Sequence, residues 1–128
     1  YLTSNKSNNL AIPLNFQAMK VEQKGHTVTI KDTQGDLVSF LMKVTHEYKT
    51  FEKHNMIIDL SMHKDLTVKA INSFLPLSKT HRKAKKSFVI VADGVDFNGV
   101  SDKLLLVPSM LEAHDMIDME EIERDLGF

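Results

Sequence analysis

The chain has 128 residues, 42% of them hydrophobic and 26% charged, with a formal net charge of -1 at pH 7. This length and balance are typical of one globular domain, and the near-neutral charge excludes a global attraction to nucleic acid or to an anionic membrane. The absence of cysteine excludes disulfides, thiolate metal sites and cysteine nucleophiles, and with no apolar run near the ~20 residues that span a bilayer we expect a soluble, cytoplasmic protein.

Residues 1–18 differ in composition from the rest of the chain. They are rich in Asn and Ser, Lys6 is their single charge, and they stop just before Met19. Residues 15–18 resemble a degraded protease site, so we interpret the segment as a leader added for expression, the alternative being a disordered N-terminal arm. A single domain is expected over residues 19–128.

The first elements of the domain are two strands joined by a turn. Residues 20–23 and 26–30 flank the turn signal Lys24-Gly25, and the second run is rich in the β-branched side chains that favour strands. We therefore expect a β-hairpin. A polar break follows, in which Thr33 and Asp36 have the spacing of a capping box.

A helix is expected from this break to about residue 53. Apolar side chains recur at intervals of three and four residues, which places them on one side of a helix. They are Leu37, Phe40, Leu41, Val44, Tyr48 and Phe51.

The centre of the chain reads as a strand, a loop and a helix in immediate succession. Residues 56–60 form an apolar run interrupted only by Asp59, which is typical of a strand covered on both faces. The polar loop that follows ends at Asp65 or Thr67, and either is a suitable N-cap for a helix starting at Val68.

Proline interrupts the helix that follows the central loop. The apolar spacing that starts at Val68 continues past Pro76, but proline removes a backbone donor and clashes with the preceding turn, so we expect a kink or a break near Leu75. Residues 87–92 form a second buried strand, which we expect to lie beside residues 56–60 and parallel to them.

The last third of the chain adds a loop, a strand and a helix. Residues 93–99 are loop, a short helical turn fits residues 98–103, and residues 104–107 are a third apolar strand. Ser109 and Glu112 form a capping box that opens the last helix.

The last helix, which Gly127 ends, has many apolar side chains. We expect its buried side to consist of Leu111, Met116, Met119, Ile122 and Leu126. Its methionines are interpreted as core filling, the alternative being a pliable contact surface.

Together these elements predict an α/β fold with the order ββαβαβ(α)βα. Strands that alternate with helices imply right-handed crossovers and a mixed, mostly parallel sheet backed by helices. The N-terminal hairpin is its antiparallel edge.

This order resembles the STAS domain, the fold of bacterial anti-sigma factor antagonists. The motif Ile57-Ile58-Asp59-Leu60-Ser61 is similar to the Val-Leu-Asp-Leu-Ser strand that precedes the regulatory loop of that family. Residues 88–91 resemble its next strand, and residues 108–113 resemble the opening of its last helix. The resemblance covers residues 19–128 and implies a STAS-like domain that regulates or links other proteins.

The regulatory loop departs from the family pattern. In STAS domains it ends in Asp-Ser-Ser-Gly, whose serine is phosphorylated by a partner kinase. Here residues 64–68 are Lys-Asp-Leu-Thr-Val, and the loop is shorter. Thr67 is the hydroxyl nearest to the position of that serine, and Ser61 is the other candidate for phosphorylation.

A second resemblance points to RNA processing. Residues 80–91 and 119–128 are similar to those of short Bacteroidota proteins that are associated with ribonuclease Z or labelled as it. That nuclease needs a dense His-x-His-x-Asp-His cluster for its zinc pair, and this sequence has none. We therefore expect no ribonuclease activity and no enzyme.

The remaining candidates for chemistry are weak. Ser61, His63 and Asp65 alternate in one loop, but a hydrolytic triad requires a geometry that such neighbours do not normally reach. Residues 96–99 lack the order of a calcium loop. The histidines are too scattered for the three or four converging donors of a metal site, so we expect no cofactor. They are His26, His46, His54, His63, His81 and His114.

Charge is more informative than these motifs. Basic side chains gather at the end of the second long helix: Lys79, His81, Arg82, Lys83, Lys85 and Lys86. Acidic side chains gather on the last helix: Glu112, Asp115, Asp118, Glu120, Glu121, Glu123 and Asp125. They are either solvated faces that partly stabilise helix dipoles, or a bipolar surface that docks a partner or forms a homodimer head to tail.

The predicted function is that of a non-enzymatic regulatory or adaptor domain, which binds a protein partner through residues 61–68 and the adjoining helices. The candidate partner-binding residues are Ser61, His63, Asp65, Thr67, Lys79, Arg82 and Lys83. The alternative is an RNA-processing accessory that contacts RNA or ribonuclease Z through the basic residues 79–86. A small hydrolase or ligand-binding domain is a third hypothesis.

Overall fold

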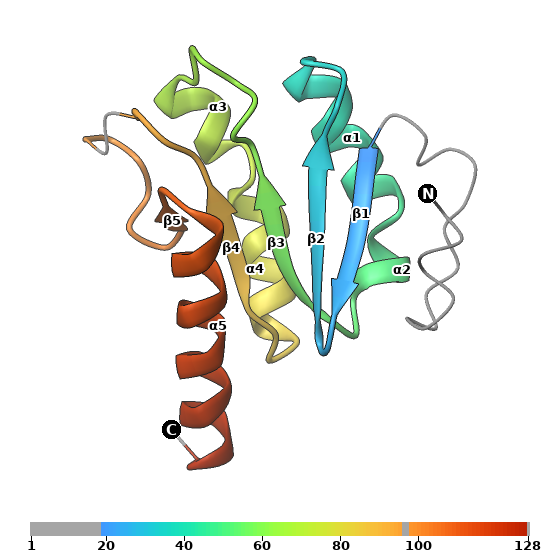
Figure 1. The fold of residues 1–128 in the computed structure, drawn as a ribbon, viewed down its shortest axis with the longest axis vertical. Coiled ribbons are helices and arrows are strands. Elements are labelled where there is room, and N and C mark those ends of the chain that lie inside the picture. Colours follow the sequence, from blue (N-terminus) through green and yellow to red (C-terminus); the bar gives the residue numbers. More distant parts are fainter. Residues whose placement is uncertain (1–18, 96–97, 128) are drawn as a thin grey trace.

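The computed structural model describes residues 19–95 and 98–127, which form one five-stranded sheet with helices on both faces (Figure 1). The strands are β1 (Met19–Lys24), β2 (Thr27–Asp32), β3 (Asn55–Asp59), β4 (Phe88–Val91) and β5 (Leu105–Val107). The helices are α1 (Leu37–His46), α2 (Tyr48–Phe51), α3 (Val68–Asn72), α4 (Leu75–Lys83) and α5 (Met110–Asp125). The segment interpreted as a leader, residues 1–18, lies outside the described residues, as do residues 96–97 of the rejected calcium loop.

The strands follow one another across the sheet in the order β1-β2-β3-β4-β5. β1 and β2 pair antiparallel, and every other neighbouring pair is parallel. The expected pairing of the two buried strands is confirmed, since Met56 lies opposite Phe88 and Ile58 opposite Ile90 in a parallel register. The α/β class and the mixed, mostly parallel sheet are therefore as predicted.

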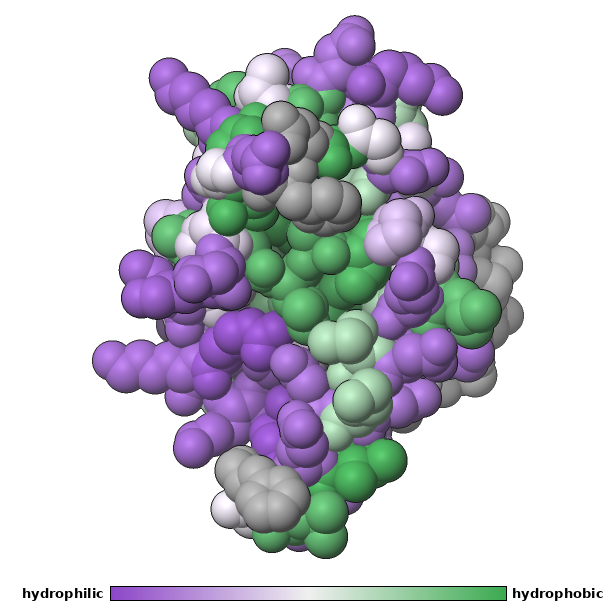
Figure 2. Space-filling view, turned by 90° about the vertical axis from the view of Figure 1, so that its left-hand side faces the viewer, coloured by the Kyte–Doolittle hydropathy of each residue, from purple (hydrophilic) through white to green (hydrophobic). Residues whose placement is uncertain are grey.

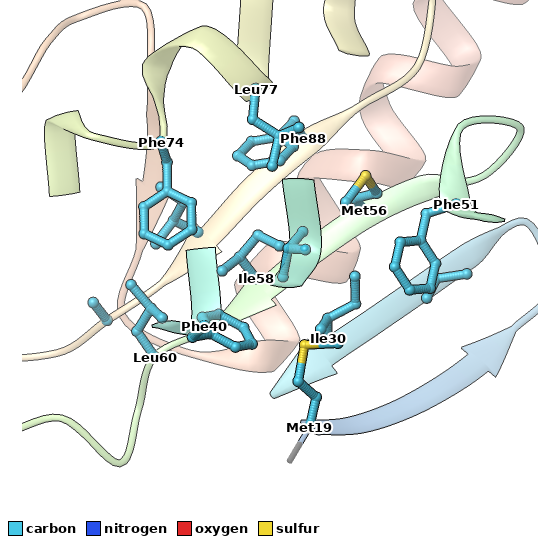
Figure 3. Packing of buried hydrophobic residues seen from close by; sticks show 14 of the residues in the cluster. Met19, Ile30, Phe40, Phe51, Met56, Ile58, Leu60, Phe74, Leu77 and Phe88 are labelled. Carbon is cyan, nitrogen blue, oxygen red and sulfur yellow. The ribbon is translucent and has the colours of Figure 1, made fainter. Parts of the chain in front are cut away.

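The main core lies between the sheet and helices α1 to α4. Side chains alternate along a strand, so Met56 and Ile58 of β3 pack with these helices while Ile57 packs with α5. The fully buried rings of this core are Phe40, Phe51, Phe74 and Phe88 (Figure 3). A smaller cluster around Ala113 and Ile117 holds α5 on the other face. Burial on both faces explains why residues 56–58 of β3 and 88–91 of β4 are continuous apolar runs.

The first helix starts and ends differently from the prediction. Asp36 is its N-cap, because the carboxylate accepts the N–H of Ser39 at 3.1 Å, and the predicted capping role of Thr33 is wrong. The single helix expected to residue 53 is divided at Glu47, whose backbone leaves the helical conformation with φ -97° and ψ 15°. Val44 in α1 and Phe51 in α2 are both buried.

The break expected in the following helix is confirmed. Thr67 is the N-cap of α3, and its hydroxyl accepts the N–H of Ala70 at 3.1 Å. α3 ends at Asn72 and α4 begins at Leu75, with Pro76 in the first turn of α4. A proline at that position removes a backbone donor that has no partner within the helix in any case.

The short helix predicted for residues 98–103 is wrong, because these residues form turns. Gly99 has a φ of +88°, in the left-handed region, which no right-handed helix contains. The side chain of Asn72 also forms hydrogen bonds with two backbone groups of this segment. It donates to the Gly99 carbonyl at 3.0 Å and accepts the N–H of Ser101 at 2.8 Å. A side chain from α3 therefore satisfies groups that a helix would pair internally.

The last helix opens as predicted but buries the opposite side. Ser109 accepts the N–H of Glu112 at 3.2 Å, which confirms the cap. The buried residues are Ala113 and Ile117, one turn apart, and both pack against strand residues of the sheet. Of the side chains expected to be buried only Met116 packs on the sheet cluster, and the others are exposed: Leu111, Met119, Ile122 and Leu126.

Candidate functional site

The loop between β3 and α3 lies at the carboxyl ends of the parallel strands. This end of an open α/β sheet is where such folds usually bind their ligands. Residues 62–67 of the loop and Gly35 and Leu37 from the β2–α1 connection line an open pocket of about 440 Å³. The loop predicted to bind a partner therefore lines a pocket together with residues from a second segment, which the sequence did not indicate.

A hydrogen bond joins this loop to the end of β2. The ring nitrogen Nε2 of His63 lies 2.8 Å from the carboxylate oxygen Oδ2 of Asp32, and the side chains are only 11% and 2% exposed. The same carboxylate accepts the N–H groups of Gln34 and Gly35 at 3.0 and 3.1 Å. Because a carboxylate accepts, His63 donates through Nε2. Sequence reasoning missed Asp32, which lies 31 positions before its partner.

The other predicted residues of this loop have distinct surroundings. Ser61 is exposed, and its backbone N–H donates to the Asp59 carboxylate at 2.9 Å. Thr67 is exposed while its hydroxyl caps α3, and Asp65 is also exposed. His63 pairs with Asp32 and not with Asp65, so the hydrogen bond between His63 and Asp65 that a triad of these loop residues would need is not formed.

Replacing Asp32 with Ala is expected to lower the free energy of unfolding by about 2 to 3 kcal/mol. The change leaves the half-buried His63 ring and two backbone N–H groups without their acceptor. Urea unfolding measures the loss, and hydrogen exchange should increase in residues 61–67. The matched control is Asp65→Ala, an exposed position of the same loop, for which a change below about 0.5 kcal/mol is expected. Equal effects of the two substitutions would contradict a supporting role for the Asp32–His63 pair.

Arg82 is part of the structure as well as of the basic cluster. Its guanidinium donates to the Glu120 carboxylate of α5 at 3.2 and 3.4 Å and to the Phe88 carbonyl at 3.2 Å. β5 pairs with β4 from Val89 onward. Through its hydrogen bond to the Phe88 carbonyl, Arg82 contacts the residue of β4 that precedes this pairing. The two oppositely charged helices are therefore joined within one chain by this ion pair.

The remaining cations of the cluster are placed differently from one another. Lys79 and Lys83 are exposed and, together with Lys103, line a groove of about 640 Å³ between α4 and β5. His81 is fully buried and does not belong to this surface, contrary to the prediction. The groove shares no lining residue with the pocket of the 61–68 loop, so the seven predicted binding residues lie in two separate places.

His81 is instead the centre of a buried hydrogen-bond chain. Its Nε2 lies 2.6 Å from the His54 carbonyl and its Nδ1 lies 2.7 Å from the Tyr48 hydroxyl. Burial lowers the pKa of His81 from 6.5 to about 4, and nearby Lys86 and Arg82 act in the same direction. Burial, with Glu52 nearby, raises the pKa of Tyr48. Both groups are therefore neutral at pH 7.

Two further features bear on the kind of site. Within residues 19–95 and 98–127, no three His, Asp or Glu side chains are grouped closely enough to hold a metal ion. Among these same residues, no helix combines the length and the apolar character needed to cross a bilayer.

Comparison with models of known protein families and with curated proteins gives no match.

Proposed function

We propose that this chain is a STAS-like regulatory or adaptor domain that binds a protein partner through residues 61–68 and the adjoining helices. The observation that carries the proposal is an exposed loop at the carboxyl ends of parallel strands, connected to the rest of the fold by side-chain hydrogen bonds. Its supports are the Asp32–His63 pair and the Thr67 cap. The sheet, a hairpin followed by parallel strands, is consistent with the STAS resemblance.

The composition of the loop surface fits a protein partner. Met62 is 39% exposed at the centre of the loop, and the half-buried Leu37 and Leu66 line the same pocket. Exposed polar residues, among them Lys64 and Asp65, surround this apolar spot. An apolar centre with a polar rim is the usual anatomy of a protein interface, and a loop that is already ordered loses less entropy when it binds.

Binding, and not catalysis, is the proposed role of His63. Its Nε2 is committed to a carboxylate that also organises the β2–α1 turn, so the pair links two loops. Thr67 and Ser61 are the proposed sites for phosphorylation in this region. A phosphate on Thr67 would place negative charge at the start of α3, where the helix dipole favours it.

The test compares two substitutions to glutamate at opposite ends of the strands. The tagged chain, its Met62→Glu variant and its Lys24→Glu variant are used to recover proteins from the native lysate. We expect a protein whose recovery falls at least about tenfold with Met62→Glu, which buries a charge in the interface, and is unchanged with Lys24→Glu at the exposed end of β1. Equal recovery with all three baits would overturn the proposal.

The alternative role in RNA processing rests on the groove lined by Lys79, Lys83 and Lys103. It has weaker support because the guanidinium of Arg82 is already engaged by Glu120. Treating the same recovered samples with ribonuclease separates the two roles. A partner that is lost with the RNA, and also with the exposed double substitution Lys79→Glu/Lys83→Glu, would favour the RNA-processing function.

A further inference from the structure

The outward side of α5 presents only apolar and acidic side chains. Its apolar residues are 56 to 72% exposed: Leu111, Met119, Ile122 and Leu126. The last three are spaced by three and four residues, so they share one side of the helix. The other exposed side chains from residue 111 to 126 are Glu112, Asp115, Asp118, Glu123 and Asp125. This helix side, which we call the outer face of α5, is opposite to Ala113 and Ile117.

No cation of α5 neutralises the outer face. Arg124 is turned towards the sheet, where its guanidinium donates to Ser87 at 3.2 Å and to Asn55 at 3.3 Å. Glu120 and Glu121 also point inward, to Arg82 and Asn55. Figure 2 looks onto the side of the molecule that carries α5, and apolar side chains recur among hydrophilic ones towards its lower end. Large apolar residues gathered on an exposed helix face usually mark a contact surface.

We propose that the outer face of α5 binds a basic amphipathic helix of a partner protein. Five carboxylates around an apolar stripe attract Lys and Arg residues that flank apolar anchors at helical spacing. The match requires both features, because the apolar side chains provide the buried area and the carboxylates select the charge of the partner.

The same charges exclude the other occupants. Two outer faces brought together in a dimer would oppose five carboxylates with five, which is unfavourable. Nucleic acid and anionic membranes repel this face for the same reason. The N-terminal residues 1–18 carry only Lys6 and lack the required positive charge.

The test is a titration of the isotope-labelled chain with a synthetic amphipathic peptide of leucine and lysine, about four helical turns long. The control peptide has glutamate in place of each lysine. We expect amide shifts on residues 111–126 with the lysine peptide, none with the glutamate peptide, and weaker binding as salt increases from about 0.05 to 0.5 M.

Two matched double variants locate the contact. Met119→Ser/Ile122→Ser should lower the affinity for the lysine peptide at least about tenfold, because two anchoring side chains lose their buried apolar area. Val38→Ser/Met42→Ser removes side chains that are 72% and 66% exposed on α1 and should leave the affinity unchanged. Circular dichroism checks that both variants are folded.

Three results would overturn the proposal. They are shifts that map away from α5, equal affinity for both peptides, and an affinity that Met119→Ser/Ile122→Ser does not change. A further measurement tests the competing occupant: if sedimentation shows a dimer of the unmodified chain that Ile122→Ser abolishes, the outer face belongs to a second copy. None of these results depends on the 61–68 loop.

Discussion

Acidification from pH 7 to pH 4 is expected to destabilise the fold through His81 alone by about 3 kcal/mol. The ring is fully buried, and its two nitrogens have fixed roles. The His54 carbonyl can only accept, so Nε2 carries the proton and Nδ1 accepts the Tyr48 hydroxyl. A second proton on Nδ1 would break the bond to Tyr48 and place a charge in the core, beside the ring of Phe88.

The direction of the effect follows from the lowered pKa. Above pH 6.5 the ring is neutral in both states, and its contribution to stability is complete. As the pH falls from 6.5 to about 4, the unfolded chain binds a proton that the folded chain excludes. The free energy of unfolding therefore falls by about 1.4 kcal/mol per pH unit over this interval. The pKa of His54 is also lowered by burial and acts in the same direction.

Urea unfolding of the natural chain and of His81→Gln between pH 7.5 and 4.5 measures this contribution. Glutamine keeps a donor and an acceptor but does not titrate, so the variant should lose less stability on acidification, and other groups cancel in the difference. Parallel pH profiles would contradict the prediction. If the variant does not fold, the proton chemical shift of the His81 ring in the natural chain gives the same answer, since it should not titrate above pH 5.

Replacing Asn55 with Ala is expected to lower the free energy of unfolding by about 2 to 4 kcal/mol and to loosen the second half of α5. Asn55 is 1% exposed at the start of β3. Its carbonyl oxygen accepts the N–H of Ser87 at 2.9 Å and the guanidinium of Arg124 at 3.3 Å, and its amide donates to Glu121 at 2.9 Å. Alanine leaves the backbone donor of Ser87 buried without this acceptor.

Asn72→Ala is the matched control, because Asn72 also bridges two segments with its amide but is half-buried. Water can replace its bonds, so a loss of about 1 kcal/mol is expected. Urea unfolding compares the two variants, and hydrogen exchange should increase in residues 117–126 only for Asn55→Ala. If α5 of the Asn55→Ala variant keeps its protection against hydrogen exchange, the prediction is wrong, and the apolar contacts of Ala113 and Ile117 hold the helix by themselves.

The candidate site was predictable in position but not in construction. Ser61 to Thr67 follow a buried strand, and polar residues after such a strand indicate a loop at the carboxyl edge of a sheet. The support of that loop, Asp32, lies at the end of β2, and no local pattern relates it to His63. Likewise, Arg82 reads as one more cation of a basic run, and only the fold places it beside Glu120 of α5 and the Phe88 carbonyl.

The sequence by itself determined the features that depend on neighbouring residues. The hairpin around Gly25, the buried runs of β3 and β4, the break before Pro76 and the cap at Ser109 each follow from side-chain chemistry within a few positions. Only the tertiary structure decided which side of α5 is buried, because the helix carries apolar side chains on two sides and the sheet covers one. It also decided that His81 is a neutral core residue, since its partners Tyr48 and His54 are 33 and 27 positions away. Periodicity records which residues share a side, whereas burial depends on what the rest of the chain brings against that side.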